Sequence, residues 1–245
     1  MTFEQLYSGS DGNLYVVTND NGKRLLIECG VTWKKIQRAL CYDLSGIVGC
    51  VVSHEHKDHC KAIREVMRAG IDVYVSEGTF GALGLINERR AKVLEQLKGV
   101  WIEPAFKIFP FSIIHDAQEP FGFILQVDGE YLLYATDTAY IKQRFTMPFS
   151  IIAIECSYDI TVLQRMIDEE KINEEVAKRL LTSHMEKKQT IRYLREFCDL
   201  SKCREIHLLH MSSDNIDREK VKKEIEDTFF IETRVVRDDS KNQRV

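Results

Sequence analysis

The chain has 245 residues, 44% hydrophobic and 29% charged, which is enough to bury one sizeable core. No stretch approaches the roughly 20 apolar residues of a membrane helix, and the first residues lack the basic and apolar runs of a secretory signal. The formal net charge of −4 argues mildly against a stable nucleic-acid binder, and seven scattered cysteines favour a reducing compartment. We therefore expect one domain over residues 1–245, no membrane partner and a cytoplasmic location.

The first half of the chain is expected to consist mainly of strands. Residues 8–13 are expected to form a turn that joins the opening strands. Apolar and β-branched runs then predict strands at 14–18, 24–28, 47–53, 71–75, 106–114, 122–127 and 131–135. Helical spacing of apolar residues predicts helices at 57–69, 77–85 and 89–97.

The second half is expected to be mostly helical, with three further strands. The predicted strands lie at 150–154, 205–209 and 231–236, and the predicted helices at 161–168, 172–181, 188–197 and 216–227. A first half rich in strands and a second half rich in helices indicate an α/β protein in which β-sheets pack together with helices outside.

One short window combines the residues of a metal site. His54-x-His56-x-Asp58-His59 follows the apolar strand 47–53 directly, and a predicted helix begins at its end. On an extended backbone the side chains of His54 and His56 point the same way, while Asp58 and His59 can reach a second point. Imidazole and carboxylate suit Zn²⁺, and they also suit Mn²⁺ or Fe²⁺. The alternative is a polar loop that contains histidines by chance.

Four ligands in one loop cannot complete two metal sites, so further ligands are expected at other strand ends. His115, Asp137 and His210 each follow an apolar strand, as the histidine-rich window does. A lone histidine after a strand is more often structural than a ligand. All three together with the window indicate side chains that converge on one site.

The order of these motifs resembles the metallo-β-lactamase superfamily over nearly the whole chain. It is most similar to the YycJ-like (WalJ) branch of metal-dependent exonucleases and to phage-encoded relatives. Glu28-Cys29-Gly30 is similar to the superfamily's Asp-x-Gly, with Glu28 in place of the aspartate. The segments that carry the resemblance to the branch are 6–13, which contains Ser-Gly-Ser-x-Gly-Asn, 115–123, which begins His-Asp-Ala, 134–138 and 209–215.

The resemblance implies an αββα sandwich, in which two mixed β-sheets pack face to face with helices outside and the site lies at one edge. It also implies two divalent metal ions, Zn or Mn with Fe also accepted. The implied ligand sets are His54, His56 and His115 for one ion, and Asp58, His59 and His210 for the other, with Asp137 between them.

Two segments depart from the branch. Glu155 to Asp159 match its Glu-x-Asn-His-Asp only loosely, and His184 stands where relatives have Gly-His-Leu-Ser. Asp58 is expected to orient a metal-bridging hydroxide, and His184 to donate a proton or anchor a phosphate. His184 is expected to open a helix whose free N–H groups also bind phosphate. The alternative is a surface histidine at a helix cap.

Three functions fit these observations. The first is phosphodiester hydrolysis, as a 5′→3′ DNA exonuclease that prefers DNA to RNA; the acidic charge weighs less against it because bound cations would add positive charge at the phosphate. The second is hydrolysis of a small lactone, thioester or cyclic nucleotide on the same fold. The third is a binding module without activity, although such proteins usually lose ligands.

Overall fold

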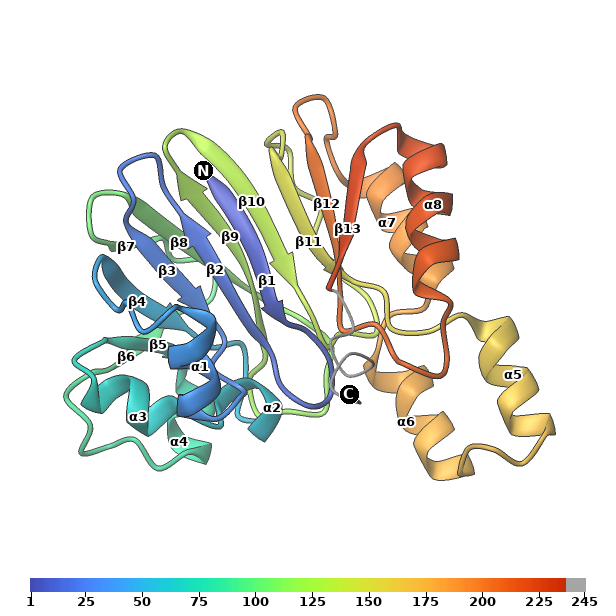
Figure 1. Cartoon of the computed structure of the whole chain (residues 1–245), viewed down its shortest axis with the longest axis horizontal. Coiled ribbons are helices and arrows are strands. Elements are labelled where there is room, and N and C mark those ends of the chain that lie inside the picture. Colours follow the sequence, from blue (N-terminus) through green and yellow to red (C-terminus); the bar gives the residue numbers. More distant parts are fainter. Residues whose placement is uncertain (237–245) are drawn as a thin grey trace.

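The computed structural model describes residues 1–236, so residues 237–245, the end of the predicted domain, lie outside the described residues. Two mixed β-sheets lie at the centre of the molecule (Figure 1). The six strands of the first sheet, from edge to edge, are β1 (Thr2–Tyr7), β2 (Leu14–Thr18), β3 (Arg24–Ile27), β4 (Ile47–Val51), β5 (Val73–Ser76) and β6 (Ala91–Leu94). The seven strands of the second sheet, from edge to edge, are β13 (Glu232–Val235), β12 (Glu205–Leu209), β11 (Ile151–Glu155), β10 (Glu130–Ala135), β9 (Phe121–Val127), β8 (Phe106–Ser112) and β7 (Val100–Ile102).

Each sheet has an antiparallel part and a parallel part. In the second sheet, β7 to β10 pair antiparallel, and β10 to β13 pair parallel. In the first sheet, β1 to β3 pair antiparallel, and β3 to β6 pair parallel. Because parallel strands end at the same edge, the chain that leaves β10, β11 and β12 emerges at one rim.

The alternation of side chains along the strands creates three apolar layers. Tyr15 and Val17 of β2 belong to the cluster between the sheets, which also contains Phe123 of β9. Leu14 and Val16 of the same strand belong to the cluster on the opposite face. This period of two is what a strand buried on both faces requires.

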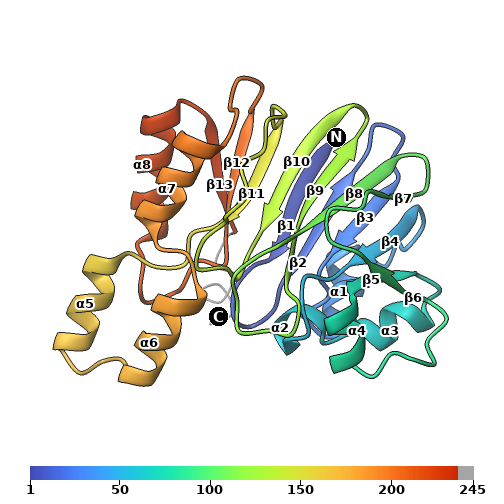
Figure 2. The same ribbon diagram turned by 180° about the vertical axis from the view of Figure 1, so that it is seen from behind.

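Helices cover both outer faces, as Figures 1 and 2 show from opposite sides. The helices beside the first sheet are α1 (Trp33–Ala39), α2 (Lys57–Cys60), α3 (Ile63–Arg68) and α4 (Glu77–Ala82). Those on the side of the second sheet are α5 (Ile160–Asp168), α6 (Glu174–Ser183), α7 (Lys187–Phe197) and α8 (Arg218–Phe229). The predicted αββα sandwich is confirmed. No described helix is both long and apolar enough to cross a bilayer.

Two predicted helices differ from the structure, and two observed elements were not predicted. The predicted helix 89–97 is wrong, because Ala91–Leu94 pairs with β5 as strand β6. The predicted helix 57–69 is interrupted, because Ala62 N–H donates to the backbone of Cys29 instead of continuing the helix. Helix α1 and strand β7 have no counterpart among the predicted elements.

Candidate metal centre

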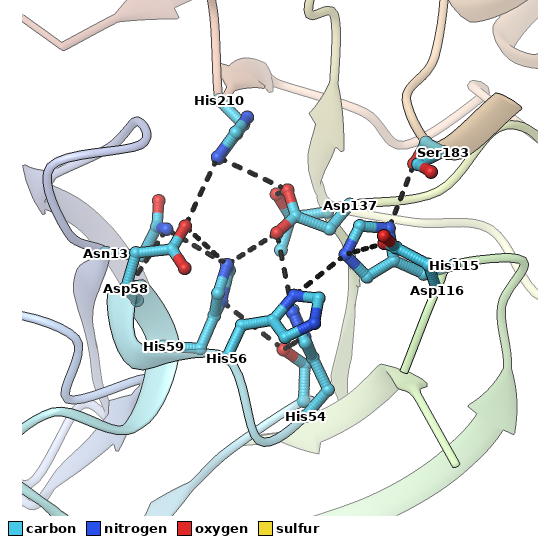
Figure 3. A network of polar contacts seen from close by, with 12 residues as sticks. Asn13, His54, His56, Asp58, His59, His115, Asp116, Asp137, Ser183 and His210 are labelled. Carbon is cyan, nitrogen blue, oxygen red and sulfur yellow. Dashed lines mark hydrogen bonds and ion pairs between the residues drawn. The ribbon is translucent and has the colours of Figure 1, made fainter. Parts of the chain in front are cut away.

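The seven residues expected as metal ligands lie together at the rim where strands of both sheets end (Figure 3). His54, His56, Asp58 and His59 come from the segment after β4, and His210 follows β12. Residues His115 and Asp137 follow β8 and β10. Segments of both sheets therefore meet at one point.

The first group consists of His54, His56 and His115, each of which offers one ring nitrogen, and these three nitrogens lie within 4.8 Å of one another. Nδ1 of His56 is 3.2 Å from Nε2 of His115. Two nitrogens bound tetrahedrally to one ion at about 2.0–2.1 Å would lie roughly 3.4 Å apart. Nδ1 of His115 donates to the Ser183 carbonyl at 3.1 Å, which leaves the lone pair on Nε2 for a metal.

The second group consists of Asp58, His59, His210 and Asp137. Oδ2 of Asp137 lies 2.5 Å from Nε2 of His59 and 3.7 Å from Nε2 of His54, which belongs to the first group. Oδ1 of Asp137 lies 3.4 Å from Nε2 of His210. The carboxylate of Asp137 therefore lies between the two groups, as a bridging ligand would.

Two buried nitrogens in this cluster support its fit to a metal. Nε2 of His54 and Nε2 of His210 are buried and accept or donate no hydrogen bond within residues 1–236. A buried polar atom without a hydrogen bond costs about 1–3 kcal/mol, and a cation in each group would satisfy it. The residues present therefore fit two divalent cations.

The charge states of these residues also suit a cation. Burial lowers the pKa of His54 well below its usual value, and the neighbouring His59 lowers it further. Burial alone would raise the pKa of Asp137, but the charges of His210 and His59 hold it well below its usual value. A neutral imidazole and an ionised carboxylate are the forms that bind metals. Burial opposes charge on His59, but the carboxylates of Asp137 and Glu28 raise its pKa well above the usual value. Without a metal these carboxylates thus favour a proton on His59, and a cation bound there would replace that proton.

Glu28 supports the cluster from beneath, a role that was not predicted. Its side chain is fully buried and accepts a hydrogen bond from Tyr134 Oη at 3.0 Å and from Ser53 N–H. Its Oε1 lies 3.5 Å from Nδ1 of His59. Glu28 therefore orients this imidazole through its other nitrogen. The similarity of Glu28-Cys29-Gly30 to the superfamily's Asp-x-Gly motif was the sequence feature that marked this position.

His184 faces the second group from the opposite side, and the prediction of its local structure is wrong. It does not open a helix: it caps the C-terminus of α6, and α7 begins at Lys187. No free N–H groups of a helix start at His184, so the predicted phosphate site on them is not formed. Nor is it a surface histidine, because its side chain is only 11% exposed.

Glu155, at the end of β11, holds His184 in place. Its Oε1 lies 2.7 Å from Nδ1 of His184, and its Oε2 accepts from Thr138 N–H at 2.7 Å. Burial opposes charge on His184, but the carboxylate of Glu155 outweighs burial and raises the pKa of His184 to about 9. Nδ1 of His184 also lies 3.7 Å from Oδ1 of Asp137. The carboxylate of Glu155 therefore favours the protonated form of His184, which lies beside the candidate metal ligands.

A cavity of about 850 Å³ opens onto this cluster. Ligand candidates His56, Asp58, His115, Asp137 and His210 line it together with His184. Its other walls include the segment from Leu6 to Gly12 and three cations, Lys35, Arg179 and Arg218. The cavity therefore offers a negatively charged ligand both a candidate metal centre and basic side chains.

The family model described as "Beta-lactamase superfamily domain" matches residues 23–211. A protein of Bacillus anthracis named exodeoxyribonuclease YycJ is 30% identical over 149 residues, which cover 58% of this chain and 56% of that relative. The match thus spans little more than half the length of the curated relative. It agrees with the resemblance to the YycJ-like branch.

Solved structures agree with the fold. The metallo-β-lactamase fold protein YhfI from Bacillus subtilis has a TM-score of 0.73 at 15% identity, covering 96% of both chains. Igni18, a metallo hydrolase from Ignicoccus hospitalis, has a TM-score of 0.69 at 15% identity, covering 96% of this chain and 95% of its own. The chain belongs to the beta-lactamase superfamily and has the metallo-β-lactamase fold.

Proposed function

We propose that this protein is a metal-dependent hydrolase, a nuclease that removes nucleotides from DNA ends in the 5′→3′ direction. The observation that carries the proposal is the composition of the main cavity. Lys35, Arg179 and Arg218 line the same cavity as the candidate metal ligands, and such cations bind phosphate oxygens. The similarity to a relative named an exodeoxyribonuclease supports DNA as the polymer.

The two groups of ligands would each hold one cation, Zn²⁺ or Mn²⁺ by the chemistry of their donors. We assign His54, His56 and His115 to one cation, and Asp58, His59 and His210 to the other, with Asp137 shared. Two such cations would supply an activated water and a positive counter-charge for the phosphate. They would also compensate for the acidic net charge of the chain.

The residues around the ligands have separate roles in this reaction. Asp58 is partly exposed to the cavity, and its carboxylate orients the attacking water by accepting a hydrogen bond. His184 donates a proton to the departing oxygen, which is a poor leaving group unless protonated. Arg179, which lies 3.2 Å from Asp116, binds a phosphate of the strand at the mouth of the cavity.

The test uses the purified chain with Mn²⁺ or Zn²⁺ and double-stranded DNA labelled at either end. We expect mononucleotide release that starts at the 5′ end. A 5′ label should therefore be lost at once, and a 3′ label last. His56→Ala removes a ligand candidate and should reduce release by at least a hundredfold. His207→Gln is the matched control, because His207 lies on β12 and contacts Gln5 and Glu205 instead of the cluster.

Two results would contradict the proposal. The first is intact single- and double-stranded DNA with every divalent metal tested. The second is turnover of lactones or thioesters by a protein that leaves bis-p-nitrophenyl phosphate intact, which would place the chain among small-molecule hydrolases of this fold.

A further inference from the structure

A second cavity of about 760 Å³ lies beside the main one. It is formed where the segment after β10, the start of α5, the end of α6 and the helix α7 meet. His184 lines both cavities. Its imidazole also lies next to the candidate metal ligand Asp137. Whatever binds in the second cavity therefore lies next to the imidazole of His184.

The lining of this cavity is aromatic and apolar. Tyr140, Tyr158, Tyr193 and Phe197 contribute rings, and several isoleucines fill the space between them. Tyr158 and Tyr193 are buried, whereas Tyr140 is 47% exposed at the mouth. Tyr140 therefore offers a flat, partly exposed ring at the mouth, the kind of surface on which nucleobases stack.

The charges of the cavity do not suit a phosphate. Apart from His184, its one lining cation among the described residues is Arg192, which pairs with Glu196 at 3.0 Å. The side chain of Glu186 adds a carboxylate, which caps α7 by accepting from Lys188 N–H. The main cavity, by contrast, is lined by three basic side chains and by the candidate metal ligands, with Asp11 and Asp214 as its other acidic residues. The two cavities therefore favour different parts of a nucleotide.

We propose that the second cavity binds the base of the 5′-terminal nucleotide, the one that the enzyme releases. The proposal rests on the nuclease function proposed above. In that reaction water adds to phosphorus and the bond between phosphorus and the 3′ oxygen breaks. The electron pair goes to the 3′ oxygen, the proton of His184 neutralises it, and the phosphate stays on the shortened strand.

Since His184 lines both cavities, a 3′ oxygen that departs beside its imidazole places the attached nucleoside at the second cavity. The volume of about 760 Å³ is within the roughly 300–1,000 Å³ of cavities that enclose small molecules. Exposed Gln189 at the rim adds an amide donor and acceptor for the edge of a base. The cavity thus offers both stacking and hydrogen bonding.

The experiment compares two DNA duplexes that differ only at the 5′-terminal residue, which carries thymine or is abasic. With the wild-type chain, we expect the KM for the abasic end to be about tenfold higher, given the usual strength of base–aromatic stacking. Tyr140→Ala should raise the KM for the thymine end by a similar factor and leave the abasic end unchanged. Tyr140→Phe keeps the ring and should restore the wild-type KM.

Tyr42→Ala is the matched control, because Tyr42 is also an exposed tyrosine, at 66%, and lines neither cavity. An unchanged melting temperature excludes unfolding of either variant. If the wild type digests both duplexes with the same KM and Tyr140→Ala does too, the base site is wrong while the nuclease function stands. If the wild type digests no DNA, the nuclease function fails, and the base site fails with it.

Discussion

His184 and Glu155 form a unit in which each residue restricts the other. Nδ1 of His184 is committed to the buried Glu155, which leaves Nε2 as the nitrogen available to a substrate. Glu155 is itself fixed by Thr138 N–H, next to the ligand candidate Asp137. The imidazole thus has one orientation, which a proton donor needs more than a structural histidine does.

We expect His184→Ala to lower kcat on DNA by about 10²–10⁴-fold, because the departing alkoxide then leaves without a proton. Hydrolysis of bis-p-nitrophenyl phosphate should fall far less, since p-nitrophenolate is a weak base that departs unprotonated. Glu155→Gln should show the same dependence on the leaving group with a smaller loss. The measurement is kcat on both substrates at one pH. Equal losses on both would instead assign His184 to the support of the metal ligands.

Residue patterns revealed the ligand candidates but not the side chains that support them. His115, Asp137 and His210 were identified because each follows an apolar strand, which is a local property of the sequence. Glu28 and Glu155 act through burial and through partners far along the chain, Tyr134 and His184. No local pattern contains those contacts: the motif Glu28-Cys29-Gly30 marked the position of Glu28 but not the partners that define its role.

At the scale of elements, the loop after β3 fixes the segment that carries two ligand candidates. Cys29 N–H donates to the carbonyl of His59, and Ala62 N–H donates to Cys29, so the loop replaces helix hydrogen bonds between α2 and α3. Gly30 lies so close that a Cβ added to it would be 1.6 Å from the carbonyl oxygen of Asp58. Only glycine allows the two backbones to pack at this distance.

We therefore expect Gly30→Ala to push the Asp58 backbone away and to lower metal content and melting temperature together. Gly81→Ala is the control, because Gly81 lies within α4 and a Cβ there meets no atom within 4 Å. Alanine in place of that helical glycine should be neutral or stabilise by about 0.5–1 kcal/mol. Metal analysis and thermal unfolding of both variants check this. Full metal content in Gly30→Ala would show that the loop does not position the ligands.

The same contact interrupts the helix that the sequence predicts over residues 57–69. Apolar residues keep helical spacing through the break, so the sequence gives no sign of the bonds to Cys29. Strand β6 was predicted as a helix for a related reason. Only Leu94 of its four residues is buried and the strand lacks alternation, so pairing with β5 makes these residues extended.

Over the whole molecule, the candidate metal centre joins the two sheets at one rim. The loop after β4 of the first sheet supplies four ligand candidates, and the ends of β8, β10 and β12 of the second sheet supply three. The sheets are already held together by the apolar cluster between them, which includes Phe3, Tyr15 and Tyr134. Individual strands were predictable from their patterns, but their sorting into two sheets rested on the resemblance.

This arrangement predicts that bound metal stabilises the fold without being required for it. Because each cation would link groups that separate on unfolding, metal at about 100 times its Kd should add roughly 2.7 kcal/mol. For a chain of 245 residues that corresponds to a rise in melting temperature of roughly 5–10 °C. Thermal unfolding after chelation and after addition of Zn²⁺ or Mn²⁺ measures the shift. The apo chain should still melt cooperatively, because the cluster between the sheets needs no cation. His54→Ala combined with His210→Ala should abolish the shift, and an unchanged shift in that variant would place the stabilising metal elsewhere.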